Sequence, residues 1–359
     1  MSKRHPYTGM PDYQFWRKET AIQYPDRFDP VTDHSFTISQ NDSIVTAGSC
    51  FAQHVARYLL NSGFNLLLTE KAHDIIPNDI ARHYNYGVFS ARYGNIYTAL
   101  QLKQLIQRAF GEFIPIEKCW AYSHDSFVDP FRPQIHPGGF ISEIELLTDL
   151  SVHLSAVKKA FESMDIFVFT LGLTEAWLDQ RDGAVFPLAP GVAGGLWDEK
   201  KYKFTNFDLE QTVSDLQWSI DYLREINPNV RILLTVSPVP LNATAVNRHV
   251  FVSTTYSKSV LRVAAETICR KFPMCDYFPS YEVITSPFVR GHYYASDCRE
   301  VIEDGVRHVM HLFLKHYGGL QFNQAVTNES PVVNYSDDHL ERMEEMIKIL
   351  CDEESIGSQ

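Results

Sequence analysis

One short stretch near the N-terminus decides the fold, and it reads Ile44-Val45-Thr46-Ala47-Gly48-Ser49-Cys50-Phe51-Ala52. Its apolar, β-branched beginning favours a strand, and Gly48 permits a sharp reversal of the chain. From Phe51 onward, apolar residues recur with helical spacing. The sequence therefore predicts that Ser49 lies at a corner where a strand passes into a helix.

A serine at such a corner is placed for nucleophilic catalysis. Its hydroxyl stands clear of the sheet, and the free amides and dipole of the helix N-terminus point at the same spot, which suits an oxyanion. Serine is also a favoured N-cap, so a purely structural role is the alternative. Cys50 is a second candidate nucleophile, because a helix N-terminus favours a thiolate. We expect Cys50 instead to contribute its backbone amide while its side chain packs.

Downstream of this corner, strand and helix patterns alternate up to about residue 317. Strands are expected at 64–68, 165–171, 230–236 and 275–278, and helices at 95–110, 141–161, 209–226 and 256–272. This alternation predicts an α/β fold, a three-layer α/β/α sandwich with a mostly parallel sheet.

The chain divides into three parts. Residues 1–40 form an arm rich in proline and aromatic residues, 41–320 form the α/β domain, and 321–359 form an acidic helix and tail. An irregular insert at about 70–150, rich in aromatic residues, histidine and proline, is expected to form a lid or substrate wall, with a local mini-core as the alternative. The C-terminal helix carries a narrow apolar stripe, which predicts docking on the body or in a homo-oligomer. The stripe consists of Leu340, Met343, Met346, Ile347 and Leu350.

Composition excludes several classes of protein. The 359 residues are 45% hydrophobic, which supports a substantial core, and the net charge of −12 argues against nucleic-acid binding. The sequence has no long apolar run and no signal-like N-terminus, so we expect a cytoplasmic protein without a membrane span. Six scattered cysteines predict reduced thiols. No Walker or Gly-x-Gly-x-x-Gly motif is present, and no cofactor is expected.

Five words in order along the chain carry a resemblance to a known family. They are Gly48-Ser49-Cys50-Phe51-Ala52, Thr170-Leu171-Gly172, Thr235-Val236-Ser237-Pro238-Val239, Tyr256-Ser257-Lys258 and Tyr277-Phe278-Pro279-Ser280-Tyr281-Glu282. Over roughly residues 40–317 the chain resembles the GSCFA family, a branch of the SGNH/GDSL-type hydrolases. The resemblance implies a flavodoxin-like topology and an ester hydrolase that uses Ser49 as nucleophile on an acylated carbohydrate or related small ester.

Two other functions stay open beside the hydrolase. One is an O-acyltransferase that moves an acyl group to a glycan hydroxyl, with acyl-CoA as its co-substrate. The other, from a different class, is a non-catalytic glycan-binding or scaffold protein derived from a hydrolase.

The resemblance also suggests an oxyanion site. SGNH relatives complete theirs with a Gly-x-Asn word, and here Gly172 keeps the glycine while Thr174 stands at the position of the amide. The backbone amides of Cys50 and Gly172 are therefore the expected donors. Beside them, Glu175 is a candidate for substrate binding or acid/base chemistry. A carboxylate that merely complements a helix N-terminus is the alternative for Glu175.

The general base is the weakest part of the pattern. Relatives carry it in an Asp-x-x-His word, but this chain reads Asp297-Cys298-Arg299-Glu300, with glutamate in the histidine's place. The first candidate is His292, oriented by Asp297, because a histidine titrates near neutral pH. His54, one helical turn beyond Ser49, is the alternative base. The third reading is that no base exists and the domain only binds a ligand.

Four further residues receive structural interpretations. His308 and His311 lie three positions apart but lack a third ligand, so we predict no metal and place them at a surface or interface. Lys258 is expected to anchor its helix, with an anionic partner as the alternative. Trp197, in a stretch from 183 to 203 that resembles an exposed loop, is expected to pack and not to stack on a sugar.

Overall fold

A parallel sheet forms the centre of the molecule. In the computed structural model, which describes residues 5–319 and 355–356, its strands run in the order β1 (Ile44–Gly48), β4 (Ile166–Leu171), β8 (Arg231–Val236) and β9 (Cys275–Tyr277). All three pairings are parallel. The two inner strands are almost entirely buried, as expected of a parallel sheet that helices cover on both faces.

The expected strand at 64–68 is reduced to a single parallel bridge between Ile44 and Leu66. Ile44 donates to the carbonyl of Asn65 (2.9 Å) and accepts from the amide of Leu67 (2.8 Å). The ladder stops there because the chain turns away, and Thr69 pairs with Ser90 instead. With this bridge counted, the order along the sheet is 2-1-3-4-5, the flavodoxin-like order.

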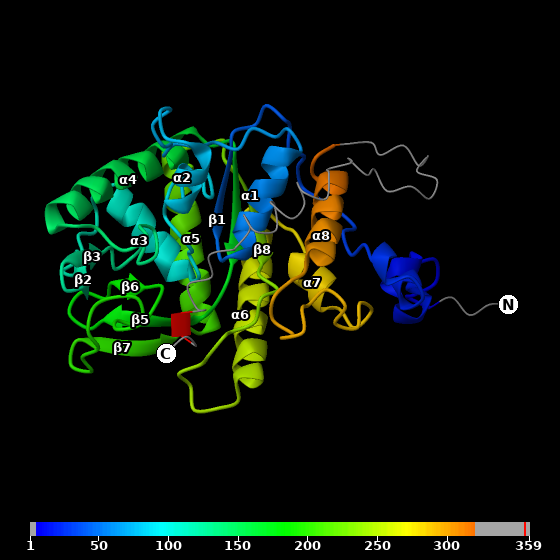
Figure 1. Ribbon diagram of the computed structural model, residues 1–359. Coiled ribbons are helices and arrows are strands. Elements are labelled where there is room, and N and C mark those ends of the chain that lie inside the picture. The colour runs from blue at the N-terminus through cyan, green and yellow to red at the C-terminus, as the bar shows by residue number, and fades with distance from the viewer. Residues whose placement is uncertain (1–4, 320–354, 357–359) are drawn as a thin grey trace.

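Helices cover both faces of the sheet, as Figure 1 shows. One face packs against α1 (Phe51–Asn61), α7 (Ser280–Thr285) and α8 (Glu303–His316). The other packs against α3 (Ala99–Ala109), α4 (Glu143–Ser163), α5 (Leu209–Ile226) and α6 (Val250–Lys271). Alternate residues of β4 face opposite cores: Ile166 and Val168 belong to the first, Phe167 and Phe169 to the second. The three-layer α/β/α architecture expected from the sequence is confirmed.

Antiparallel strands that the sequence did not predict form two small sheets. The hairpin of β2 (Trp120–Ser123) and β3 (Ser126–Val128) lies in the insert, which also contains α2 (Asn78–His83). The other small sheet has the order β6-β5-β7, with β5 (Glu175–Asp179), β6 (Val185–Phe186) and β7 (Tyr202–Asn206).

The stretch from 183 to 203 was expected to be an exposed loop, and this expectation is wrong in part. Phe186 and Ala184 are fully buried, and Phe186 packs with Trp120 of the insert and Tyr202 in a separate small core. Non-local aromatic packing therefore orders a stretch that is locally rich in glycine and proline. Trp197 stays 48% exposed and its ring contacts Trp177 edge-on at 5.0 Å, a packing contact.

The N-terminal arm lies beside α7 and α8 (Figure 1). It forms four short 3-10 helices, η1 (Asp12–Gln14), η2 (Trp16–Lys18), η3 (Thr20–Ile22) and η4 (Pro25–Arg27). Trp16 and Phe28 both contact the ring of Phe288, and the Ile38 amide donates to the carbonyl of Tyr317 (2.7 Å). Aromatic contacts therefore hold the arm on the body.

Two expectations concern the chain beyond these elements. The predicted apolar stripe from Leu340 to Leu350 lies outside the described residues. Within the described part, none of the helices has the length and apolar character needed to cross a membrane.

Candidate active site

The predicted corner at Ser49 is confirmed. β1 ends at Gly48, Cys50 caps the N-terminus of α1, and Ser49 lies between them. Gly48 has a φ of +134°, and a Cβ there would lie 2.3 Å from the carbonyl oxygen of Thr170. Only glycine allows β1 and β4 to approach this closely at the turn. The Ser49 amide then donates to the same Thr170 carbonyl at 3.0 Å, which fixes the corner on β4.

The Ser49 hydroxyl is buried and has no hydrogen-bond partner among the described residues. The residue is 2% exposed, and its Oγ is a buried polar atom without a donor or acceptor in range. On the neighbouring strand, the Thr170 hydroxyl is in the same condition. Ser257 and Ser280 are equally buried, yet both hydroxyls are bonded. Because a buried unpaired hydroxyl costs about 1–3 kcal/mol, the Ser49 hydroxyl requires an explanation.

Gly172, at the end of β4, lies directly against Ser49. A Cβ at Gly172 would lie 2.9 Å from the Ser49 Cβ and 3.2 Å from the Cα of Tyr97. The sequence predicted that the Gly172 amide faces an oxyanion position. In the structure this amide already donates to the carbonyl of Tyr97 (3.0 Å), as does the Leu173 amide (2.9 Å). The expected donor is present, but the Tyr97 oxygen occupies its acceptor position.

A segment of the insert, residues 95–98, covers this edge of the sheet. All four of its residues are at most 3% exposed. The Ile96 amide donates to the carbonyl of Gly48 (2.7 Å), and the Gln53 side chain donates to that of Asn95 (3.0 Å). Gln101 Oε1, in the capping box of α3, accepts from the amides of Tyr97 and Thr98, each at 3.0 Å. These four residues belong to the insert that was expected to form a lid or substrate wall, and we call them the cover segment.

Helix α6 braces the chain on the other side of Gly172. Lys258 is 1% exposed, and its Nζ donates to the Gly172 carbonyl at 2.8 Å. Ser257 Oγ accepts from the amide of Thr174 at 3.0 Å. Within Tyr256-Ser257-Lys258, Ser257 and Lys258 therefore hold the turn that follows β4, and the bond of Lys258 to the Gly172 carbonyl supports the expected anchoring role.

Thr174 and Glu175 serve structural contacts in this conformation. The Thr174 hydroxyl donates to Asn206 Oδ1 of β7 (2.7 Å). Glu175 begins β5, so it is not the carboxylate of a helix N-terminus, and that alternative is wrong. Its carboxylate accepts from the Thr244 hydroxyl (2.6 Å) and the Ala245 amide (3.2 Å), which ties β5 to the loop before α6.

Neither candidate base is bonded to Ser49. His54 is 8% exposed on α1, and burial, helped by the adjacent Arg57 guanidinium, lowers its pKa to about 3. The Arg57 Nη2 lies 3.4 Å from its Nδ1. At neutral pH His54 is therefore uncharged and weakly basic, which disfavours it as a general base.

His292 and Asp297 lie on the exposed loop between α7 and α8. Among the described residues, no hydrogen bond joins their side chains. Instead, Asp297 Oδ1 accepts from the amides of Arg299 (3.0 Å) and Glu300 (3.1 Å), and these bonds lower the pKa of its carboxyl group. The loop does reach the carboxyl end of β8, because the Tyr294 hydroxyl donates to the Pro238 carbonyl (2.8 Å). The loop that carries the predicted pair is thus anchored at the carboxyl end of β8, and His292 and Asp297 do not bond to each other among the described residues.

Two of the three histidines of α8, His308 and His311, were interpreted from the sequence as surface or interface residues. His308 Nδ1 lies 2.7 Å from the Tyr293 hydroxyl, and burial lowers the pKa of both His308 and His311. Among the described residues no group of three His, Cys, Asp or Glu side chains could hold a metal ion.

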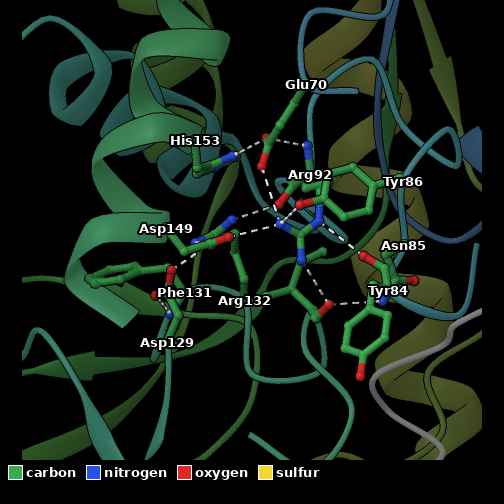
Figure 2. A network of polar contacts seen from close by, with 11 residues as sticks. Glu70, Tyr84, Asn85, Tyr86, Arg92, Asp129, Phe131, Arg132, Asp149 and His153 are labelled. Carbon is green, nitrogen blue, oxygen red and sulfur yellow. Dashed lines mark hydrogen bonds and ion pairs between the residues drawn. The ribbon is translucent and has the colours of Figure 1, made fainter. Parts of the chain in front are cut away.

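A second buried polar centre lies in the insert, and Figure 2 shows it. Arg92 is 2% exposed and pairs with Asp149 (2.9 Å) and Glu70 (3.4 Å). Arg132 pairs with the other Asp149 oxygen (2.8 Å) and with Asp129 (2.7 Å). We call these side chains, together with His153, the arginine network. Arg92 lies three positions before Asn95, the first residue of the cover segment.

The Glu70–His153 pair shows how the network controls ionisation. Burial by itself raises the pKa of Glu70. The hydrogen bond with His153 (2.7 Å), the charge of Arg132 and the Arg92 amide outweigh it, and the pKa falls to about 2. Burial, followed by repulsion from Arg132, lowers the pKa of His153 to about 4. At neutral pH Glu70 is therefore a carboxylate, and neutral His153 donates to it.

The fold and the site together define an α/β protein with a buried serine where its first strand turns into a helix. The model of the GSCFA family matches residues 43–313, more than half of the chain, and the protein belongs to this family. No curated protein sequence matches the chain.

Sequence reasoning missed Tyr97, Thr170 and the arginine network. Tyr97 contacts Gly172 and Leu173 through its backbone carbonyl, a group that a sequence cannot single out. Thr170 does carry a signal, a hydroxyl in an otherwise apolar strand at a carboxyl end. The network's charges are spread over the insert, where periodicity is lost, and nothing local indicates which of them pair.

Proposed function

We propose that this protein is a serine-dependent ester hydrolase of the SGNH/GDSL type, cytoplasmic, with Ser49 as nucleophile and an acylated carbohydrate or related small ester as substrate. One observation carries the proposal: the Ser49 hydroxyl is buried, unpartnered and placed at the carboxyl ends of parallel strands. In open α/β sheets ligands bind at this edge. A hydroxyl kept there at an energetic cost is typical of a reactive group.

The reaction follows from this placement. The Ser49 Oγ bonds to the acyl carbon, the carbonyl electron pair moves onto oxygen, and the serine proton passes to a general base. Backbone amides around the corner, those of Cys50 and Gly172, stabilise the oxyanion. The intermediate then collapses: the alcohol leaves with the transferred proton, and water releases the acyl group from the serine by the same steps.

The cover segment favours a second candidate, an O-acyltransferase. Four nearly fully buried residues close over Ser49, and a closed site protects an acyl-enzyme from water. With acyl-CoA as donor, the acyl group then passes from Ser49 to a glycan hydroxyl in place of water. Both candidates share the first half-reaction and differ only in the acceptor.

In this reaction His292 is the base, and Asp297 is the carboxylate that orients it. Support comes from the anchor of their loop at Pro238, on the same edge as Ser49, and from the depressed pKa of His54. Assembly of the pair requires Asp297 to exchange its bonds to the Arg299 and Glu300 amides for one to His292.

Labelling with a fluorophosphonate tests the nucleophile, because the probe reacts with activated serines. Wild type is expected to be labelled and to hydrolyse a short-chain acyl ester, and Ser49→Ala to do neither, a loss of about 10⁴-fold or more. Cys50→Ala is the control, since it removes the neighbouring thiol and leaves Ser49 in place. Labelling that survives in Ser49→Ala would falsify the assignment.

The acceptor and the base need separate assays. Adding a sugar acceptor to the ester assay is expected to raise turnover if the protein is a transferase and to leave it unchanged if it is a hydrolase. His292→Ala is expected to slow turnover about 10²-fold or more, and His54→Ala to change it little. If wild type is neither labelled nor active, the protein is instead a glycan-binding or scaffold member of the family, as Glu300 in the histidine's position suggests.

A further inference from the structure

Two consecutive amides converge on one oxygen beside Ser49. The amides of Gly172 and Leu173 donate to the Tyr97 carbonyl at 3.0 and 2.9 Å. Successive N–H groups that point to a common position form a nest, a backbone concavity that binds anions. Here a neutral carbonyl occupies the nest. Ser49 lies next to it, because its Cβ would be only 2.9 Å from a Cβ on Gly172.

Lys258 determines the direction in which this nest opens. In a trans peptide the C=O and N–H groups point to opposite sides. The Lys258 ammonium holds the Gly172 carbonyl at 2.8 Å, so the Leu173 N–H of the same peptide faces away from α6, toward Tyr97. Ser257, on the same helix, holds the following Thr174 amide. Helix α6 therefore holds the Gly172 carbonyl and the Thr174 amide on the side of the nest away from Tyr97.

The Tyr97 carbonyl, by contrast, meets the nest through hydrogen bonds between neutral groups, while its side chain is 2% exposed and packs against Leu173 and Leu241. Apart from the nest itself, backbone contacts of its segment run from Ile96 to Gly48 and from Tyr97 and Thr98 to the Gln101 side chain. These are hydrogen bonds between neutral groups, and each adds little net stability because water competes for the same donors and acceptors. An oxyanion binds two amides more strongly than a carbonyl does, because charge-assisted hydrogen bonds are roughly twice as strong.

We propose that the amides of Gly172 and Leu173 form the binding site for the oxyanion of the reacting ester, that Lys258 positions them, and that the Tyr97 carbonyl fills the site until substrate displaces it. This inference rests on the proposed role of Ser49. It adds Leu173 to the expected amide donors at Cys50 and Gly172, and it makes Tyr97 an internal competitor of the substrate.

The positioning role of Lys258 is tested by Lys258→Met, which keeps much of the volume and removes the ammonium. The readout is the rate of Ser49 phosphonylation against probe concentration. The maximal rate is expected to fall about 10²-fold, the effect of losing one oxyanion donor, while the half-saturating concentration changes little. Lys258→Arg, which retains a donor, is expected to restore part of the rate. Lys103→Met, which breaks a bridge to Asp215 between α3 and α5, is the control and should react like wild type.

Displacement of Tyr97 is tested on the Gln101→Ala variant and by hydrogen exchange. Gln101→Ala loosens the cover segment and is expected to raise the phosphonylation rate several-fold. In wild type, formation of the Ser49 adduct should speed exchange of the Ile96 amide, because its bond to Gly48 opens. The Gly172 and Leu173 amides should stay protected by the phosphonyl oxygen. Exchange at Ile96 that stays slow in the adduct overturns the displacement.

The outcomes separate this inference from the proposed function. If wild type is labelled and both Lys258→Met and Gln101→Ala react at the wild-type rate, Ser49 remains the nucleophile. The proposed oxyanion site at the Gly172 and Leu173 amides is then overturned. If only Gln101→Ala is labelled, both the role of Ser49 and the displacement of Tyr97 are supported, because the cover segment then keeps the probe out of the wild-type site. No labelling in any variant refutes the nucleophile, and the inference fails with it. If Lys258→Met does not fold, as thermal unfolding shows, Gln101→Ala and the exchange pattern still decide.

Discussion

The arginine network and the Ser49 corner are both buried and polar, but they differ in how their polar atoms are satisfied. In the network, Arg92 and Arg132 meet three carboxylates and several carbonyls, and neutral His153 completes the set. At the corner, the hydroxyls of Ser49 and Thr170 meet no partner among the described residues. The contrast teaches that burial alone does not leave a polar group unpaired in this fold, and that Ser49 is one of several buried side chains with an unpaired polar atom among the described residues.

Arg92→Met is expected to have the largest effect on stability. It leaves the Glu70 and Asp149 carboxylates without one of their cations, and breaking a buried ion pair costs about 3–5 kcal/mol. Urea unfolding followed by circular dichroism measures the loss. Arg270→Met, which breaks an exposed pair with Glu266, is the control and should cost less than about 1 kcal/mol. Equal losses of unfolding free energy in both variants would show that the buried pairs of Arg92 stabilise the protein no more than an exposed pair does.

Acid should weaken the network through His153. Its pKa is about 4 in the folded protein and 6.5 in a free side chain, so between these values the unfolded state binds more protons. The free energy of unfolding therefore falls as the pH drops from 6.5 to 4, by up to about 3 kcal/mol from this group. His54 acts in the same direction, so the measurement is the difference in pH dependence between wild type and His153→Gln. Parallel pH curves for the two proteins would contradict the assignment.

Gly172→Ala tests how tightly the corner is packed. The new Cβ would lie 2.9 Å from the Ser49 Cβ, and overpacking of this kind costs about 1–3 kcal/mol. Combining it with Ser49→Gly removes the colliding atom, so a double-mutant cycle in urea should show that the two changes are not additive. Additive costs would place the strain at Tyr97, the other neighbour of this Cβ.

Ser49→Ala should cost no stability and should raise the free energy of unfolding by up to about 1–3 kcal/mol, because it removes a buried hydroxyl that has no hydrogen bond among the described residues. Ser257→Ala is the matched comparison, since this serine is equally buried. Its hydroxyl accepts from the Thr174 amide, and removing it should cost about 1–3 kcal/mol. Thermal and urea unfolding of both variants compare them. A large loss in Ser49→Ala would mean that the hydroxyl is satisfied after all.

Local pattern predicted the framework of this protein and the position of Ser49. The run from Ile44 to Gly48 is a strand and Phe51 begins a helix, because propensity and periodicity act over a few residues. The buried strand ending at Leu171 and the helix over 209–226 were predicted for the same reason.

The rest depends on contacts between distant parts of the chain. The small sheet of β5, β6 and β7 forms by pairing across loops, so Glu175 was assigned to the wrong kind of element. Arg92 meets Asp149 across 57 positions, and no local pattern indicates that pairing. The cover segment contacts the turn after β4 through the carbonyl of Tyr97, a group that every residue has, so the sequence marks Ser49 but not this contact.

The outer edge of β1 is closed by three different kinds of partner. Ile44 pairs with the backbone of Asn65 and Leu67, Thr46 bonds to the side chains of Ser90 and Tyr93, and Gly48 accepts from Ile96. An open strand edge is a template on which another chain can add a strand. The cover segment thus also helps to keep this strand edge from pairing with another chain. The proposed displacement of Tyr97 would uncover the end of that edge, so a variant with a loosened cover segment should gain reactivity and lose solubility together.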